Sequence, residues 1–318
     1  MPRRSPSSSK RTTRDSPPAM SSGIASGRRA TRLSGRAWVP YAYLAPALLV
    51  YGVFLLFPIV RAAQFSLFDW DGLGESTFVG LDNYVTVFQD GQLLEAFGHA
   101  FVLIFFFSIL PLAIGLLVAA VLNRSTVKGL GFFRTVLFLP QVIAMVVVAV
   151  AWRQIYAPDG VLNGTLRAFG LGNLTRPWLG DYTFTLPAVG FVGTWVATGL
   201  VIVLMLAGMG RIPREQYEAA RLDGANAVRE FFAVTLPAVR GEITVALTLT
   251  IIAALKTFDL VYVTTRGGPG TSTTVPSYEI YRRAFEIGDV GLAAAVGIVL
   301  TIVVLLITTV INRIGDRS

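Results

Sequence analysis

Six long apolar segments constrain the fold of this 318-residue chain more than any other feature of its sequence. Each is long enough to cross a hydrocarbon core of roughly 30 Å, which takes about 20 helical residues. They are apolar on all sides, whereas helices that cover a soluble core are amphipathic. Only 14% of the residues are charged. We therefore predict an all-α integral membrane protein with six transmembrane helices, at about residues 41–63, 100–122, 136–156, 189–209, 243–263 and 290–311.

The lysine and arginine residues are distributed unevenly between the two sides of the predicted membrane. With the N-terminus inside, nineteen of them fall in segments on the inner side and five in the outer loops. The positive-inside rule then predicts that both termini are cytoplasmic. Topology and anionic lipid account for the net charge of +8, so no nucleic-acid partner is expected.

The N-terminal segment is rich in serine, arginine and proline and contains few large apolar residues. We predict that residues 1–37 are a disordered basic cytoplasmic tail and that residues 38–318 form the transmembrane domain. The pairs Arg3-Arg4 and Arg28-Arg29 leave a twin-arginine export signal as an alternative. Against that alternative, the next apolar run is too long for a signal peptide and has no clear cleavage site.

A polar island of residues 210–241 separates the fourth and fifth apolar segments. Pro213 suits the first turn of a helix, because it has no N–H group to leave unsatisfied. Gly224 can adopt the left-handed conformation that ends a helix, and Asn226 can cap a second one. The island therefore predicts a helix, a tight turn and a second helix outside the membrane.

The first helix of this island carries charges that could pair along one face. Arg214 and Glu218, and Glu218 and Arg221, have the spacing of helical neighbours. On composition alone, the island could also be an ordinary amphipathic turn between two membrane helices.

The first outer loop, residues 64–98, contains six acidic residues and no lysine or arginine. Residues 78–84 form a small apolar and aromatic cluster with turn residues at its centre. This cluster could pack against the helix ends, or it could be a docking surface for a partner.

Two predicted helices contain polar residues at membrane depth. Pro140 frees a backbone carbonyl in the third helix, and Gln141 could satisfy it or face a cavity. Lys256 and Asp259 in the fifth helix are three residues apart, which places them on one face. An ionisable pair inside a membrane indicates a functional site. The alternative is a salt bridge near the outer interface.

Signals for catalysis and metal binding are absent from the sequence. It contains no G-x-x-x-x-G-K-[ST] phosphate loop, no H-E-x-x-H and no G-x-S-x-G motif. It also has no cysteine, and its single histidine, His99, cannot form a histidine metal cluster. We expect His99 at the outer interface of the second helix. We predict a chain that is not an enzyme and binds no metal or cofactor of its own.

The polar island resembles the EAA loop of the permeases of ABC importers. Glu218-Ala219-Ala220, Asp223-Gly224-Ala225, Phe231 and Leu236-Pro237 fall at the family's spacing. Further motifs resemble the carbohydrate-uptake branch, in particular the first of its two permease subunits. They are Gly80-Leu81-Asp82-Asn83-Tyr84, Phe133-Arg134-Thr135, Leu139-Pro140, Trp152, Phe258-Asp259, Thr265-Arg266-Gly267-Gly268-Pro269, Tyr281, Phe285, Asp289, Gly291 and Ala294-Ala295. The resemblance covers residues 45–311.

This resemblance implies one half of the pore of an ATP-driven importer for sugars or oligosaccharides, in the cell membrane of a prokaryote. It implies a second permease subunit and a dimer of ATPase subunits that carries the ATP and Mg. It also implies an extracytoplasmic solute-binding protein. The residues it assigns to coupling with the ATPase are Glu218, Ala219, Ala220, Asp223, Gly224, Leu236 and Pro237. Candidate residues of the substrate path are Gln141, Trp152, Trp195, Lys256 and Asp259. Candidates for docking the binding protein are Gly80, Leu81, Asp82, Asn83, Tyr84, Gly267, Gly268 and Pro269.

Two other classes of membrane protein remain as alternatives. An ion-coupled secondary carrier of a small polar solute would explain six helices and the ionisable residues Lys256 and Asp259. Carriers usually contain internal repeats, and none is evident between the two halves of this sequence. A membrane-embedded enzyme is the other alternative, and the absence of a catalytic motif argues against it.

Overall fold

The computed structural model describes residues 39–124 and 129–317. The predicted disordered tail, residues 1–37, lies outside the described residues and remains a prediction. The chain divides into two units with a boundary after Gly52, and residues 39–52 are the described part of the first. The described part of the first unit forms α1 (Val39–Tyr51), which contains Pro46. The side chains of residues 43–51 are exposed, as expected of a helix surrounded by lipid.

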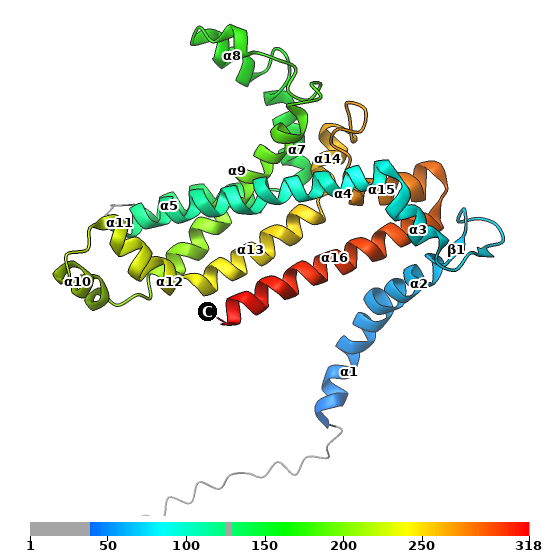
Figure 1. Ribbon diagram of the computed structural model, residues 1–318, viewed down its shortest axis with the longest axis horizontal. Helices are drawn as coiled ribbons and strands as arrows, with labels where there is room; N and C mark the ends of the chain where they lie inside the picture. The colour runs from blue at the N-terminus through cyan, green and yellow to red at the C-terminus, as the bar shows by residue number, and fades with distance from the viewer. Residues whose placement is uncertain (1–38, 125–128, 318) are drawn as a thin grey trace, which may run out of the picture. The chain divides into compact units, whose positions relative to one another are not determined.

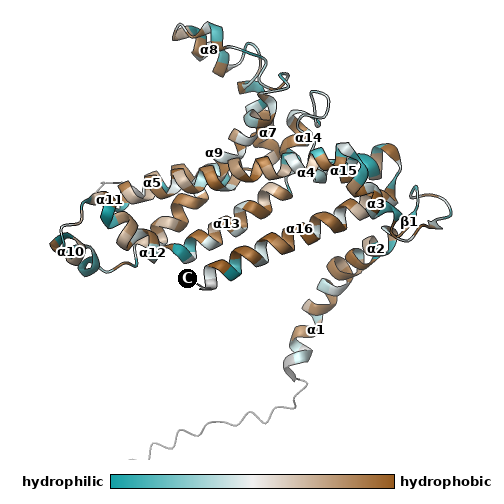
Figure 2. Ribbon diagram, in the orientation of Figure 1, coloured by the Kyte–Doolittle hydropathy of each residue, from teal (hydrophilic) through white to brown (hydrophobic). Residues whose placement is uncertain are grey.

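Four helices in the described part of the chain are long and apolar enough to cross a membrane, and two bent helix pairs would raise the number to six. This agrees with the predicted all-α architecture of six spans. The four spans are Tyr43–Phe65, Gly91–Asn123, Thr185–Met209 and Val290–Gly315. Figure 2 shows apolar residues along most of α16 (Val290–Arg317), in contrast to the polar helix α10 (Arg214–Leu222).

π-helical turns interrupt two of the spans without ending them. The first span continues from the π-helical Gly52–Leu56 into α2 (Phe57–Phe65). The second consists of α4 (Gly91–Ile104), the π-helical Phe105–Ile109 and α5 (Leu110–Arg124).

The fourth span, α9 (Thr185–Met209), is the core of the second unit and packs against α5, α6 and α13. Two of its glycines permit this close packing. A Cβ atom at Gly193 would overlap the ring of Phe107, and one at Gly199 would overlap the carbonyl oxygen of Leu137. Small residues at such positions let membrane helices approach one another closely, where van der Waals contact stabilises their association.

The third span is broken, so the predicted continuous helix over residues 136–156 is wrong. α6 (Leu130–Val142) and α7 (Met145–Ile155) are separated by Ile143 and Ala144, and their axes differ by 96°. Pro140 lies inside α6, as expected, and the two residues at the break have extended backbones. Irregular backbone at membrane depth is tolerated where it is covered by protein or lines a cavity, and Ile143 lines two cavities.

The fifth span also differs from the predicted helix over residues 243–263. α13 (Arg240–Leu255) ends at Leu255, and a separate short helix, α14 (Asp259–Thr264), follows. At its N-terminal end α13 is preceded, after a bend of 69°, by α11 (Ala227–Glu230), the π-helical Phe231–Thr235 and α12 (Leu236–Ala238). The helical chain that enters the span therefore begins inside the polar island.

Shorter elements lie at the two ends of the long helices in the second unit. α10, α11 and α12 lie at the end where the chain terminates, whereas β1 and α15 lie at the opposite end (Figure 1). At that opposite end, β1 (Phe68–Asp69) pairs antiparallel with β2 (Thr77–Phe78). The remaining short elements are α3 (Asp82–Gln89), α8 (Val161–Ala168), the 3-10 turn Gly172–Leu174, α15 (Pro276–Tyr281) and the π-helical Arg282–Ile287.

Candidate functional site

The polar island folds as the predicted helix, turn and helix. α10 ends at Leu222, and Gly224 follows with a φ of +77°, which a residue with a side chain rarely adopts. The side chain of Asn226 then accepts a hydrogen bond of 2.9 Å from the Arg229 N–H and caps α11. The sequence signals for the turn and the cap therefore predicted this local structure correctly.

The ion pairs expected along α10 are not the ones that form. Arg221 Nε donates instead to Glu230 on α11, at 3.1 Å, and the Glu230 side chain is only 4% exposed. This hydrogen bond raises the pKa of Arg221 above its usual value, and the charge of Glu218 adds to the rise at longer range. Within the described residues no ion pair joins Glu218 to Arg214 or Arg221, because the turn brings Glu230 next to Arg221.

A second polar contact fixes the angle between the two helices of the island. The Tyr217 hydroxyl on α10 lies 3.2 Å from Oγ1 of the buried Thr235. Because Tyr217 and Arg221 both face the second helix, the opposite face of α10 is free. The exposed residues Ala219 and Asp223 lie on that face, and Glu218, which is also exposed, lies at its edge.

The exposed surface of the island is more apolar than the sequence analysis assumed. Leu222 is 89% exposed, Val228 64% and Phe232 60%. Of the residues assigned to coupling, Gly224 and Pro237 are exposed as well, whereas Ala220 and Leu236 are half-buried. Large exposed apolar side chains on a polar segment are typical of a protein interface.

Two of the aromatic candidates for the substrate path lie side by side. The rings of Trp152 on α7 and Trp195 on α9 are 5.6 Å apart and inclined by 66°. Both line a cavity of about 330 Å³ beside the break between α6 and α7. Trp195 and Ile143 also line a neighbouring cavity of about 510 Å³. Gln141 is exposed on α6 but lines neither of these two cavities.

Lys256 and Asp259 do not lie on one helical face, which corrects the sequence interpretation. Lys256 caps the end of α13 and Asp259 begins α14, with a non-helical segment between them. Among the described side chains no ion pair links the two. Both nevertheless line a cavity of about 310 Å³ together with Phe107 and Phe258. The break in the helix, which sequence periodicity did not predict, turns both exposed charges toward the same space.

The first candidate docking segment, residues 80–84, contains two residues that bind to the rest of the fold and two that are exposed. Asn83 Nδ2 donates to the carbonyl oxygens of Ser66 at 3.0 Å and Phe68 at 2.9 Å, and the Tyr84 hydroxyl lies 2.6 Å from Ser66 Oγ. These two side chains therefore hold α3 against the end of α2. Leu81 and Asp82 are exposed and remain free for a partner.

The second candidate docking segment is a tightly built turn after α14. Gly267 has a φ of +82°, and its carbonyl oxygen accepts a hydrogen bond of 3.0 Å from the Thr273 N–H. The segment that follows is attached to α4. Thr271 donates to Glu95 at 3.0 Å, and His99 Nδ1 contacts the Thr274 carbonyl oxygen at 2.9 Å. Gly267, Gly268 and Pro269 thus shape the turn by their backbone.

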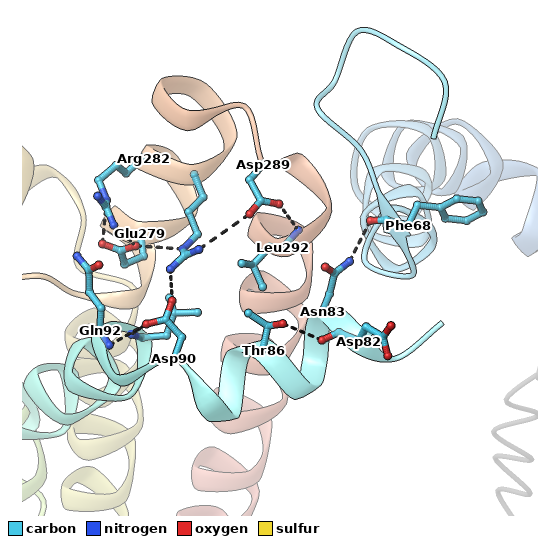
Figure 3. Close-up of polar contacts among 12 residues, drawn as sticks. Phe68, Asp82, Asn83, Thr86, Asp90, Gln92, Glu279, Arg282, Asp289 and Leu292 are labelled. Atoms are coloured by element: carbon cyan, nitrogen blue, oxygen red, sulfur yellow. Dashed lines mark hydrogen bonds and ion pairs between the residues drawn. The ribbon is translucent and has the colours of Figure 1, made fainter. Parts of the chain in front are cut away.

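A buried ionic cluster at the same end was missed by the sequence analysis. Glu279, whose side chain is 0% exposed, accepts hydrogen bonds from Arg282 at 2.9 Å and from Arg283 at 3.2 Å. Arg283 also donates to Asp90, which caps α4, and lies 4.0 Å from Asp289 at the start of α16 (Figure 3). The i, i+4 spacing of Glu279 and Arg283 could have indicated a pair, but only the fold brings Asp90 to it.

The stability contributed by Asp90 should depend on pH. Burial raises the pKa of its carboxyl, but the Gln92 N–H and the Arg283 guanidinium lower it by more, so the net pKa lies below its usual value. A lowered folded-state pKa stabilises the fold above the unfolded pKa of about 3.9, and this contribution is lost as the pH falls through the folded value. We expect Asp90→Asn to lower the melting temperature at pH 7 and to have little effect near pH 3. An effect that stayed constant across this range would contradict the ionic role of Asp90.

The comparisons with known proteins identify the class. The sequence matches the family described as "Binding-protein-dependent transport system inner membrane component" over residues 36–318, and the chain belongs to this family. It is 40% identical to the probable ABC transporter permease protein YurN of Bacillus subtilis, over 84% of this chain and 92% of the relative. It is 36% identical to the diacetylchitobiose uptake system permease protein NgcF of Streptomyces coelicolor, over 85% of this chain and 80% of the relative.

A solved structure agrees with this assignment. The fold is similar to a bacterial ABC transporter involved in the import of the acidic polysaccharide alginate, with a TM-score of 0.76 and 26% sequence identity. The similarity covers 88% of this chain and 96% of the other. The chain is thus a permease subunit of an ABC importer, and the secondary carrier is not favoured.

Proposed function

We propose that this permease carries sugars or oligosaccharides into a prokaryotic cell and forms half of the translocation path together with a second permease subunit. The names of its relatives support the substrate class, since they include a diacetylchitobiose uptake system and a multiple sugar-binding transport system. The observation that carries the rest of the proposal is the polar island. It is held together by its own contacts, and it exposes Glu218 one helical turn from the exposed Leu222.

The partner at the polar island is an ATPase subunit, which would bind the ATP and Mg. The small side chains of Ala219 and Ala220 let another protein approach α10 closely, and Glu218 can form a charge-assisted hydrogen bond with a basic residue there. Gly224 sets the angle between the two helices, and Leu236 and Pro237 lead the chain back to α13. Asp223 lies at the C-terminal end of α10 on the exposed side of the turn. Closure of the ATPase dimer would then move α13 through α12.

The partner at the opposite end is an extracytoplasmic solute-binding protein. A solved relative of this fold is an alginate ABC transporter in complex with an alginate pentasaccharide-bound periplasmic protein. In this chain the contacts we assign to it are the exposed residues Leu81 and Asp82 and the half-buried turn residues Gly268 and Pro269, whereas the buried Gly267 only shapes the turn. With this orientation the polar island and both termini are cytoplasmic, in keeping with the excess of lysine and arginine at that end.

The substrate path would pass the broken segments of the third and fifth spans. Sugars are bound by aromatic faces and by hydrogen bonds, and Trp152, Trp195, Lys256 and Asp259 offer both at the walls of cavities. Gln141 belongs to this path only if the second permease closes over the exposed face of α6.

The chain itself catalyses no reaction in this proposal and holds no cofactor. No group of three or more potential metal-ligating histidine or acidic side chains occurs in residues 39–124 and 129–317. The energy for transport would come from ATP hydrolysed by the partner.

Uptake measurements test the proposed function directly. A strain that lacks this gene should lose accumulation of at least one labelled mono- or disaccharide, and the intact gene should restore it. Unchanged uptake of every sugar, with loss of a different solute, would overturn the substrate class while leaving the importer assignment intact.

Replacing the acidic residue at the break of the fifth span should change selectivity. We expect Asp259→Ala to lower uptake of the preferred sugar by about tenfold relative to other sugars, since a buried hydrogen bond to a charged group contributes about 1.5–3 kcal/mol. The matched control is Asp159→Ala, because the Asp159 side chain is 99% exposed in an outer connection. Competition assays with unlabelled sugars measure the uptake of the preferred sugar relative to the other sugars. A uniform loss of assembly would show that Asp259 is structural.

A further inference from the structure

An apolar groove of about 690 Å³ lies between α2 and the last two helical segments, and it is separate from the cavities of the substrate path. One wall is formed by α2, including Phe57 and Phe65, and the other by α16, including Ala294, Gly297 and Thr301. Phe285, which is 78% exposed and belongs to the π-helical segment before α16, also lines the groove.

Arg61 is the only charged residue that lines this groove. It lies within the span Tyr43–Phe65, where a cation is costly unless it is paired. Its Nη1 donates to Gln64 at 2.7 Å, and its guanidinium carbon lies 4.6 Å from the centroid of the Phe65 ring. In the described part of the chain no carboxylate forms an ion pair with it. The groove therefore presents an unneutralised cation beside a long apolar surface.

The dimensions of the groove match one leaflet of a bilayer. Its α16 wall runs from Val290 to Thr301, which at 1.5 Å per residue is about 17 Å. Half of a hydrocarbon core of roughly 30 Å is about 15 Å. Arg61 lies one turn below Phe65, and its contact with Gln64 directs it toward the nearer membrane surface, as expected of a snorkelling side chain.

We propose that this groove binds a phospholipid of the leaflet next to α3, with the lipid phosphate at Arg61 and an acyl chain against Ala294, Gly297 and Thr301. The negative charge of the phosphate complements Arg61, the only cation that lines the groove. The acyl chain is apolar like the walls of the groove, and its length in one leaflet matches the length of the α16 wall. The site goes beyond the proposed transport function, because it faces neither the polar island nor the cavities beside Trp195 and Asp259.

The absence of cysteine from the sequence makes a site-specific test simple. Ile298→Cys places a fluorophore in the groove, and Leu306→Cys places one on the same helix outside it, where Leu306 is 62% exposed. The labelled chain is reconstituted with its partner subunits in phosphatidylcholine, and phosphatidylglycerol with brominated acyl chains is added as the quencher. Quenching should saturate at low mole fraction at position 298 and rise linearly at position 306.

Removing the cation should then remove the saturable component. We expect Arg61→Gln to raise by about fivefold the mole fraction of phosphatidylglycerol that gives half-maximal quenching at position 298, because one cation near the lipid headgroup is lost. Arg61→Lys, which keeps the charge, should raise this mole fraction less. The matched control Arg153→Gln removes another exposed cation, one on α7, and should have no effect. Linear quenching at both positions would overturn the proposal. The absence of any quenching at position 298 would also overturn the proposal, because a protein partner would then cover the groove.

Discussion

Glu218→Lys should abolish ATP-driven uptake while the protein remains inserted in the membrane. Glu218 is exposed on α10, whereas Tyr217 contacts the second helix, and the Glu218 residue itself forms no ion pair in the described part of the chain. Its carboxylate is therefore available to a basic residue of the ATPase. Loss of one partner of a buried charge pair costs about 3 kcal/mol, so transport should fall by roughly 100-fold or more.

A neighbouring glutamate provides the control for this experiment. Glu215→Lys makes the same charge change in the first turn of α10, outside the EAA sequence, and should retain most of the uptake. Membrane insertion and assembly with the ATPase are measured alongside transport. Full transport by the Glu218→Lys variant would contradict the coupling role of this residue. Equal losses in both variants would mean that net charge, and not this position, matters.

Arg283→Ala should destabilise the end of the protein that carries α3 and α15 more than the loss of any surface ion pair. The Arg283 side chain is 11% exposed and bonds Glu279, which is fully buried, and Asp90, which caps α4. Without Arg283, Glu279 keeps only Arg282, and Asp90 loses its cation. Removing one partner from a buried ionic cluster costs about 3–5 kcal/mol. We expect a clear fall in the thermal unfolding temperature of the purified protein in detergent.

The matched control is an ion pair at the other end of the long helices, in which the arginine is exposed and the Glu242 side chain is 20% exposed. Arg211 contacts Glu242 at 3.5 Å, and its side chain is 78% exposed. Surface pairs contribute about 0–1 kcal/mol, so Arg211→Ala should change the unfolding temperature little. Comparable losses in the two variants would show that the cluster around Arg283 adds no more than a surface pair.

The sequence predicted the fold class because the relevant signals are local. Each span is a run of apolar residues, and Gly224 and Asn226 act on their own backbone to end one helix and begin the next. The same local signals failed where tertiary contacts decide. The apolar composition of residues 136–156 gave no sign of the break at Ile143 and Ala144. Similarly, Arg221 pairs with Glu230 across the turn and not with its helical neighbour.

The residues of the candidate site were also selected from local signals, and their roles in transport remain predictions. The residues of the EAA sequence and the aromatic pair Trp152 and Trp195 could be selected from motif and residue type. That the two tryptophans line one cavity follows from the packing of α7 against α9. The cluster around Arg283 was not predictable, since Asp90 and Arg283 are far apart in sequence and the cluster forms only when α4 and α15 meet.

The sequence by itself therefore determined that this chain is a helical membrane protein with a polar helix-turn-helix, because hydropathy, capping residues and turn glycines act within one helix or turn. Only the tertiary structure decided which side of α10 is free, where the third and fifth spans break, and how Arg61 comes to border an apolar groove. These features depend on contacts between segments distant in sequence. Long-range packing of this kind is set by the shapes of whole helices, which no single motif encodes.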